Sequence, residues 1–297
     1  LPRRRHLGAL MPIPGYRPKL IATDLDGTVV HHDNTITERT IKAFRKAHDM
    51  GIEIFFVTGR PPRWMPAIRD AFGIGNAICA NGAILFDLLN HKVLEEWLIP
   101  VDAQMEIFMK LREAIPHCHF ALEYGDNFFR EKLYNAKWDR GVDNSGVDVI
   151  EDKVSEPAFK ILVRCESAEL TSDEMLAIAK EKVGHLCSVT HSNPHESLLE
   201  IAAIGVSKGE TLAKIAARAG IAQEDVVSPT TFLSIHDYQT NKYYETTVGE
   251  LEANEKAQNV DPGAARTKSF FFTFFTSVPS TAPTAPHLHL QESFASP

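Results

Sequence analysis

The segment 19–58 constrains the fold of this chain more than any other part. It begins with a short apolar run, K-L-I-A-T-D-L, which is typical of a buried parallel strand. Apolar residues at helical spacing follow over 37–50, with Thr37 as the expected N-cap and Gly51 as the expected left-handed stop. A second buried strand is expected over 52–58. Strand, helix and strand form one crossover unit, in which the two strands are parallel.

The next elements predict a continuation of this sheet. A helix is expected over 61–72, opened by prolines, and a short strand over 77–80. Asn81-Gly82 is a turn signal.

Beyond that turn the pattern changes. Over 83–184 hairpin-like strands alternate with two helical stretches, which is typical of an inserted α+β module. The chain is expected to return to the core through a strand at 198–201 and a helix over 207–219. The predicted fold class is therefore α/β: a Rossmann-like parallel sheet core with helices on both faces, plus an inserted α+β domain. The expected boundaries are an N-terminal extension at 1–17, a discontinuous core at 18–84 and 185–228, the inserted domain at 85–184, and a divergent, poorly ordered tail at 229–297. Met11 is the expected start of the protein.

Charge and composition narrow the classes of partner. The chain of 297 residues has a net charge of −8, which disfavours binding to a nucleic-acid backbone because that mode needs a concentrated basic surface. No apolar run is long enough to span a bilayer, the phenylalanine cluster at 270–275 included. Four scattered cysteines form no C-x-x-C pair, which favours reduced thiols in a cytoplasmic protein. A small-molecule partner is expected.

Two carboxylates two residues apart follow the first strand, at Asp24 and Asp26. One such carboxylate can attack phosphorus while the other exchanges protons, and Mg²⁺ suits the oxygen ligands that they supply. A solvated turn would show the same pair. Ligands in open parallel sheets bind beyond the carboxyl ends of strands, and Asp24 and Thr58 both lie at such ends. We therefore expect them to be neighbours.

Four motifs follow one another along the chain: Asp24-Leu25-Asp26-Gly27-Thr28, Val57-Thr58-Gly59-Arg60, Asn81-Gly82-Ala83 and Gly205-Val206-Ser207-Lys208-Gly209. In this order they resemble the haloacid dehalogenase superfamily, and more narrowly its Cof-type sugar phosphatase branch with a type IIB cap. The resemblance covers roughly residues 18–227.

The resemblance implies a role for each motif residue. Asp24 would be the nucleophile and a metal ligand, and Asp26 the general acid and base that also offers its carbonyl to the metal. Thr58 would hold a phosphate oxygen, together with the backbone of the Gly59-Arg60 turn, whose residues are further candidates for phosphate binding. Taken alone, the Thr-Gly-Arg motif also fits a simple strand-to-helix turn.

Lys208 would be the second cation of the site, although a lone lysine is usually a surface residue. Asn81 is a weaker candidate for a substrate contact, because a hinge turn explains Asn-Gly equally well. The inserted module would be the mobile cap. Its candidate contacts are Glu123, Asp126, Arg130 and His191, each more typical of a solvated surface, and His117, His119 and His195 favour a half-buried strand and turns over a metal cluster.

One element of the family pattern is missing. The resemblance implies a further acidic loop, G-D-x-x-N-D, soon after the lysine helix, but after Val227 the chain continues S-P-T-T-F. Asp237 is the only nearby carboxylate that would substitute for it. Two readings stay open: a Mg²⁺-dependent phosphatase acting on a sugar or polyol phosphate, with a phosphomutase as a variant of it, and an impaired or non-catalytic phosphate-binding remnant.

Overall fold

The computed structural model describes residues 17–31, 33–136, 145–165, 170–192, 196–228, 233–237 and 242–246. Its described residues fall into two compact units. The first comprises those within Leu1–Val57, Ile68–Asn76 and Leu212–Pro297, and the second those within Thr58–Ala67 and Ala77–Thr211. The domain boundaries expected from the sequence stay a prediction.

The first unit contains the expected crossover. β1 (Leu20–Thr23) pairs in parallel with β2 (Glu53–Val57), and on its other side with β11 (Val226–Val227), so the order is β11-β1-β2. The register of β1 and β2 ends with Thr23 opposite Phe56. The two strands therefore run the same way and end side by side, as the sequence predicts.

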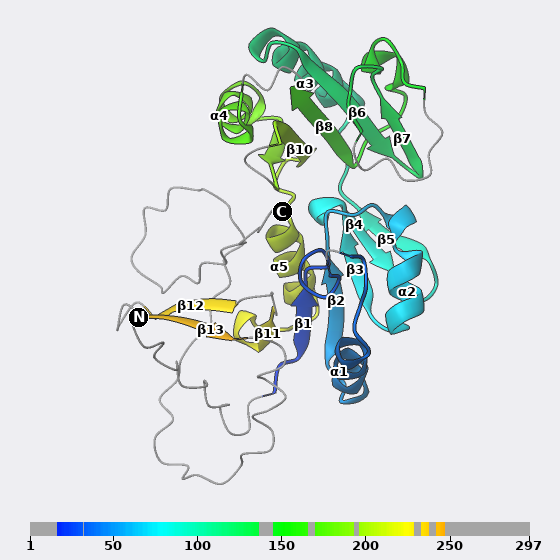
Figure 1. The fold of residues 1–297 in the computed structure, drawn as a ribbon, viewed down its shortest axis with the longest axis vertical. Helices are drawn as coiled ribbons and strands as arrows, with labels where there is room; N and C mark the ends of the chain where they lie inside the picture. The colour runs from blue at the N-terminus through cyan, green and yellow to red at the C-terminus, as the bar shows by residue number, and fades with distance from the viewer. Residues whose placement is uncertain are drawn as a thin grey trace. The chain divides into compact units, whose positions relative to one another are not determined.

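The helix between these strands is α1 (Glu38–Asp49), drawn in blue in Figure 1. The side chain of Thr37 caps it by accepting a hydrogen bond from the Thr40 N–H, and Gly51 adopts the left-handed φ of 81° that ends it. Both predictions are confirmed. Phe44 of α1 packs against Phe56 and Phe72, with ring centres 6.0 and 5.6 Å apart.

The helix expected over 61–72 is two helices. A 3₁₀ turn spans Pro62–Trp64, and α2 spans Pro66–Phe72. Pro66 has no N–H and cannot continue a preceding helix, so a new one begins there.

The second unit contains most of β3 (Asn76–Cys79), together with β4 (Ile84–Asp87) and β5 (Lys92–Glu96). β4 and β5 form an antiparallel hairpin. A five-stranded antiparallel sheet follows, in the order β7-β6-β8-β10-β9. Its strands are β6 (Cys118–Tyr124), β7 (Asn127–Arg130), β8 (Lys160–Cys165), β9 (Cys187–Thr190) and β10 (Leu198–Ala203).

The strand at 198–201 corrects one expectation. It was expected to return the chain to the parallel core, but it is β10, which pairs antiparallel with β8 and with β9. Its burial alternates over Leu198–Ile201, as in a strand with one apolar and one polar face. Leu199 and Ile201 lie on the buried face, and Leu198 and Glu200 lie on the other.

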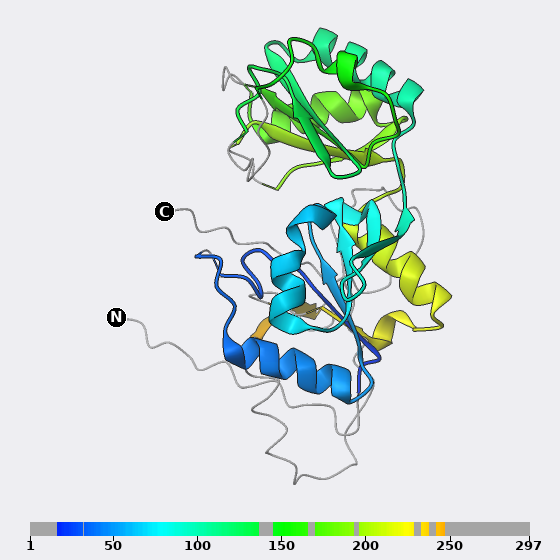
Figure 2. The same cartoon turned by 90° about the vertical axis from the view of Figure 1, so that its right-hand side faces the viewer.

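The five-stranded sheet has two unlike faces. α3 (Val101–Ala114) and α4 (Ser172–Val183) lie on the same side of it, as Figure 2 shows. Phe108 of α3 meets Phe120 of β6 on that apolar side, with ring centres 5.0 Å apart. The other face carries charged side chains that are nevertheless buried: Glu123, Lys160, Arg164 and Glu200.

All four cysteines are free, buried and in the second unit: Cys79, Cys118, Cys165 and Cys187. Burial raises the pKa of the Cys118 and Cys187 thiols to about 12. These thiols are therefore protonated and poorly reactive in the folded chain.

The two ends of the chain lie mostly outside the described residues, and with them the expected extension and most of the expected tail. In the tail the structure describes one antiparallel hairpin, β12 (Leu233–Asp237) with β13 (Lys242–Thr246). Asp237, the proposed substitute ligand, ends β12. Among the described residues no helix is both long and apolar enough to cross a membrane.

Candidate active site

The two carboxylates of the first motif lie in the loop directly after β1. Leu25, between them, is fully buried, whereas Asp24 is half-buried and Asp26 exposed. The loop closes on itself, because the N–H groups of Thr28 and Val30 both donate to the Leu25 carbonyl, at 3.2 and 2.8 Å. Leu25 anchors the loop in the core, and this leaves the neighbouring carboxylates on its outer side.

The second motif forms a turn directly after β2, in the second unit. Thr58 is fully buried, and its backbone N–H donates to the Ile78 carbonyl of β3. The Arg60 N–H donates to the Thr58 hydroxyl oxygen at 3.0 Å. The hydroxyl is thus held by its own turn.

The Asn81-Gly82 turn packs against both neighbouring motifs. The Asn81 N–H donates to the Thr58 carbonyl at 3.0 Å, and a Cβ on Gly59 would lie 2.8 Å from Asn81 Oδ1. A Cβ on Gly82 would lie 2.4 Å from the Ser207 carbonyl oxygen. Gly82 requires glycine, because its φ is 112° and the obstacle is backbone, whereas a side chain at position 59 would displace the Asn81 amide.

Lys208 begins α5 (Lys208–Arg218). Ser207 caps this helix, since its hydroxyl accepts from the Glu210 N–H at 3.1 Å, and the Thr211 hydroxyl donates to the Gly82 carbonyl at 2.8 Å. The positive end of α5 is therefore fixed next to the Asn81-Gly82 turn.

The structure brings together the second, third and fourth motifs, all within the second unit. Thr58, Gly59, Arg60 and Asn81 are joined by hydrogen bonds and close packing, and the start of α5 contacts Gly82. Asp24 and Asp26 belong to the first unit, so their relation to these residues stays a prediction.

Two buried charged residues next to the Gly59-Arg60 turn were not predicted from the sequence. Lys160 of β8 and Glu200 of β10 form an ion pair 2.9 Å apart, with side chains 6% and 12% exposed. Lys160 Nζ also donates to the Gly59 carbonyl at 2.7 Å, and Asn81 Nδ2 donates to Glu200 Oε2 at 2.8 Å. The sequence did contain a signal for them, since Lys160 and Glu200 each lie within an apolar strand. A charged residue in such a strand is almost never buried without a partner, so each of them predicts one.

The Glu200 carboxyl is kept ionised by these neighbours. Burial raises its pKa, but the charge of Lys160 and hydrogen bonds from Ser192, Lys160 and Asn81 outweigh burial and hold the pKa at about 2. The Glu200 carboxyl beside the Gly59 turn is therefore ionised at neutral pH.

Glu123 corrects another expectation, because it was taken as typical of a solvated surface. Its side chain is 5% exposed and lies 2.6 Å from Arg63, although these two atoms lack hydrogen-bond geometry. The Arg63 guanidinium also lies 5.8 Å from the ring centres of Trp64 and of Phe128. Its place in the sheet, opposite Lys160, makes Glu123 part of the charged face.

The other candidate residues of the expected cap are scattered. Asp126 is exposed in the β6–β7 turn, Arg130 donates to the carbonyl of Glu131, and His191 pairs with Asp173 at 2.7 Å. Among the histidines weighed as metal ligands, His119 lies 3.5 Å from the buried Glu131, and His195 is outside the described residues. Within the part of the chain that the structure describes, no three His, Cys, Asp or Glu side chains are grouped around a metal position.

The donor set of the first motif nevertheless fits Mg²⁺ in kind. Its two carboxylates and the backbone carbonyl of Asp26 are hard oxygen ligands, and Mg²⁺ usually completes its shell with water and substrate oxygens.

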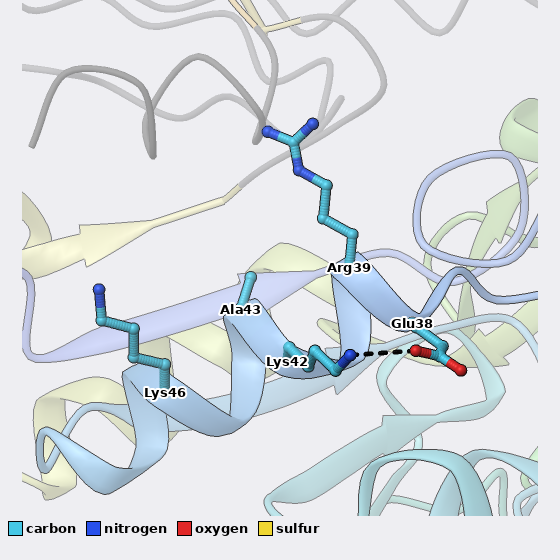
Figure 3. Close-up of a pocket in the computed structure, with 5 residues that line it drawn as sticks. All are labelled: Glu38, Arg39, Lys42, Ala43 and Lys46. Carbon is cyan, nitrogen blue, oxygen red and sulfur yellow. Dashed lines mark hydrogen bonds and ion pairs between the residues drawn. The ribbon is translucent and has the colours of Figure 1, made fainter. Parts of the chain in front are cut away.

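One hollow, of about 510 Å³, lies along α1 (Figure 3). It is lined by Glu38, Arg39, Lys42, Ala43 and Lys46, of which Lys42 and Glu38 form an ion pair. These residues offer no pair of carboxylates for phosphate chemistry. We do not assign the active site to this hollow.

The parallel strands β1 and β2, with a carboxylate loop after the first of them, define an α/β protein, a class in which ligands bind beyond the carboxyl ends of the strands. The model of the haloacid dehalogenase-like hydrolases matches residues 21–228, and the chain belongs to that family. The superfamily resemblance of the four motifs is thereby confirmed.

Known relatives agree with the narrower branch. The chain is 25% identical over 211 residues to 5-amino-6-(5-phospho-D-ribitylamino)uracil phosphatase YcsE of Bacillus subtilis, covering 71% of this chain and 75% of that one. It is 26% identical over 226 residues to pyridoxal phosphate phosphatase YbhA of Escherichia coli, covering 71% and 80%. The solved structure of the subclass IIB sugar phosphatase BT4131 matches with a TM-score of 0.57 at 21% identity, covering 71% and 79%. The expected fold class is confirmed.

Proposed function

We propose that this chain is a Mg²⁺-dependent phosphatase that hydrolyses a small phosphate ester, a sugar or polyol phosphate, through an aspartyl-phosphate on Asp24. One observation carries the proposal: the Asp24-Leu25-Asp26 loop follows a central parallel strand in a chain of the haloacid dehalogenase-like hydrolase family. The relatives named as phosphatases of phosphorylated small molecules support the same substrate class.

Each motif residue has a chemical task in this proposal. Asp24 attacks phosphorus and forms an acyl phosphate, and Asp26 protonates the leaving oxygen and then activates water. The Thr58 hydroxyl and the backbone of the Gly59-Arg60 turn hold phosphate oxygens, with Asn81 as a weaker contact. Lys208, at the positive end of α5, stabilises the negative charge.

The family also supports a bound Mg²⁺, which Asp24 and the Asp26 carbonyl would hold and which would neutralise charge on the phosphate. A net charge of −8 and four free thiols support a cytoplasmic enzyme without nucleic-acid or membrane partners.

Release of phosphate from a panel of sugar phosphates tests the proposal, with Mg²⁺ and with a chelator. We expect release that stops with the chelator and in Asp24→Asn. Full activity of Asp24→Asn would contradict the aspartyl-phosphate. Isomerised sugar phosphate without free phosphate would instead identify a phosphomutase.

A second function is supported by the missing acidic loop. No G-D-x-x-N-D motif follows Val227, so Mg²⁺ would lack the ligands that fix its geometry. A phosphate-binding protein without turnover would bind inorganic phosphate and release none from any ester. Any release that a chelator stops would exclude it.

A further inference from the structure

The buried amine of Lys160 reaches from the five-stranded sheet to the turn after β2. Its Nζ donates to the Gly59 carbonyl oxygen at 2.7 Å and to Glu200 Oε2 at 2.9 Å. A buried ammonium group is costly to keep unless it is paired and hydrogen-bonded. These two acceptors therefore fix where the amine lies, and the amine fixes the Gly59 carbonyl.

The Gly59 carbonyl and the Arg60 N–H belong to one peptide group. A trans peptide is planar, so its C=O and N–H point to opposite sides. Lys160 holds the carbonyl side, and the Arg60 N–H on the other side donates to Thr58 Oγ1 at 3.0 Å. One rigid group thus joins the Lys160 amine to the Thr58 hydroxyl.

We propose that Lys160 is a positioning residue for the hydroxyl of Thr58, acting through the Gly59–Arg60 peptide. A hydroxyl has one donor and two acceptor lone pairs. With one lone pair occupied by the Arg60 N–H, the hydroxyl proton points away from that peptide. The use of this proton for a phosphate oxygen rests on the proposed function, whereas the positioning does not.

Glu200 completes the arrangement as a second positioning residue. Its Oε2 accepts from Lys160 and Asn81, and its Oε1 accepts from Ser192 at 2.6 Å. The Asn81 amide turns its Nδ2 to Glu200 and its Oδ1 to Gly59. Lys160 therefore holds the Gly59 carbonyl, the Asn81 amide lies close to Gly59, and Glu200 accepts hydrogen bonds from both Lys160 and Asn81.

A purely structural ion pair is the alternative, and β8 offers a matched control. Arg164 is on the same strand and the same face, and its residue is 5% exposed, against 4% for Lys160. It donates to the Glu196 carbonyl at 3.1 Å and not to the turn. Loss of either cation removes a buried charge from β8, but only loss of Lys160 frees the peptide.

The first test follows the Arg60 amide proton by NMR hydrogen exchange without any ligand. We expect Lys160→Met to speed its exchange about fivefold, because the peptide loses its fixed orientation, while Arg164→Met leaves it unchanged. The double variant Lys160→Met/Glu200→Gln carries no unpaired buried charge, so it keeps the test valid if Lys160→Met unfolds. An unchanged Arg60 amide in a folded Lys160 variant would overturn the proposal, as would equal acceleration in Arg164→Met.

The second test is a double-mutant cycle on the Kd of inorganic phosphate with Mg²⁺, using Thr58→Val. We expect about tenfold weaker binding in Thr58→Val and about fivefold weaker binding in Lys160→Met. If Lys160 acts through Thr58, adding Lys160→Met to Thr58→Val weakens binding by less than about twofold more. Full multiplication of the two effects would overturn the proposal. Absence of phosphate binding and hydrolysis in the parent chain would reject the proposed function, and the Arg60 amide would then decide the positioning alone.

Discussion

The loop after β1 and the charged face of the five-stranded sheet differ in how far their ionised side chains are exposed to solvent. Asp24 and Asp26 flank one buried leucine and stay accessible, whereas Lys160 and Glu200 are buried against each other. An accessible carboxylate can be reached by solvent and by a ligand, whereas a buried ion pair is shielded from both. The accessible carboxylates of this chain are therefore expected to carry the chemistry, and the buried ion pair is expected to hold the Gly59 turn in place.

The largest effect is expected at Asp24. Asp24→Asn should lower phosphate release by about a thousandfold or more, because an amide is not a nucleophile toward phosphorus. The free energy of unfolding should change by no more than about 0.5 kcal/mol, since the side chain is not fully buried. Activity assays and urea unfolding measure the two quantities.

Asp49→Asn is the control for this substitution, since it makes the same chemical change at the exposed end of α1. It should alter neither quantity. Strong destabilisation by Asp24→Asn would show that this carboxylate also has a structural role. It would contradict the expectation that the accessible carboxylates serve the chemistry alone.

The next effect is on stability, at Lys160. Lys160→Met should destabilise the chain by about 3–5 kcal/mol, because it leaves Glu200 as an uncompensated buried charge. Lys42→Met removes one partner of an equally short pair on α1, 3.0 Å apart but exposed, and should cost less than about 1 kcal/mol. Urea unfolding measures both effects. Equal destabilisation by Lys160→Met and Lys42→Met would show that burial of the Lys160–Glu200 pair does not raise the cost of losing one partner.

A third effect appears in acid. The pKa of Glu200 is about 2 in the folded chain, against 4.5 for a free glutamate, so its contribution to stability is complete above pH 4.5 and is lost as the pH falls toward 2. Glu200→Gln should remove this part of the acid dependence. The fall in Tm between these pH values should therefore be several degrees smaller in the variant. Parallel Tm curves would show that Glu200 is not ionised as described.

The smallest effect concerns a helix cap. Thr37→Ala should destabilise the chain by about 1 kcal/mol, because the Thr40 N–H loses its acceptor. Thr37→Ser keeps an oxygen in place and should restore most of this stability. Since Thr37 belongs to none of the four motifs, catalytic constants should be unchanged, and a loss of activity would show that α1 influences the site.

The sequence predicted local features better than long-range ones. Thr37, Gly51 and the parallel pairing of β1 and β2 follow from short patterns, and the structure confirms them. The strand at 198–201 was assigned to the wrong sheet, because its alternation predicts a strand but not its partner.

The candidate site shows the same limit. The Thr58, Asn81 and Lys208 motifs were recognised by their letters, whereas Lys160 and Glu200 lie 40 residues apart and become partners only through strand pairing. Pairing between distant residues is set by packing of the whole sheet, which no window of sequence contains.

The distribution of cysteines has a practical consequence. All four thiols are buried in the second unit, and the described residues of the first unit contain none. A thiol-reactive dye will therefore label this protein only when the second unit opens, and the rate of labelling at increasing urea concentration will report the opening of that unit by itself. The four native cysteines thus serve as a probe for the opening of the second unit, and no engineered cysteine is needed.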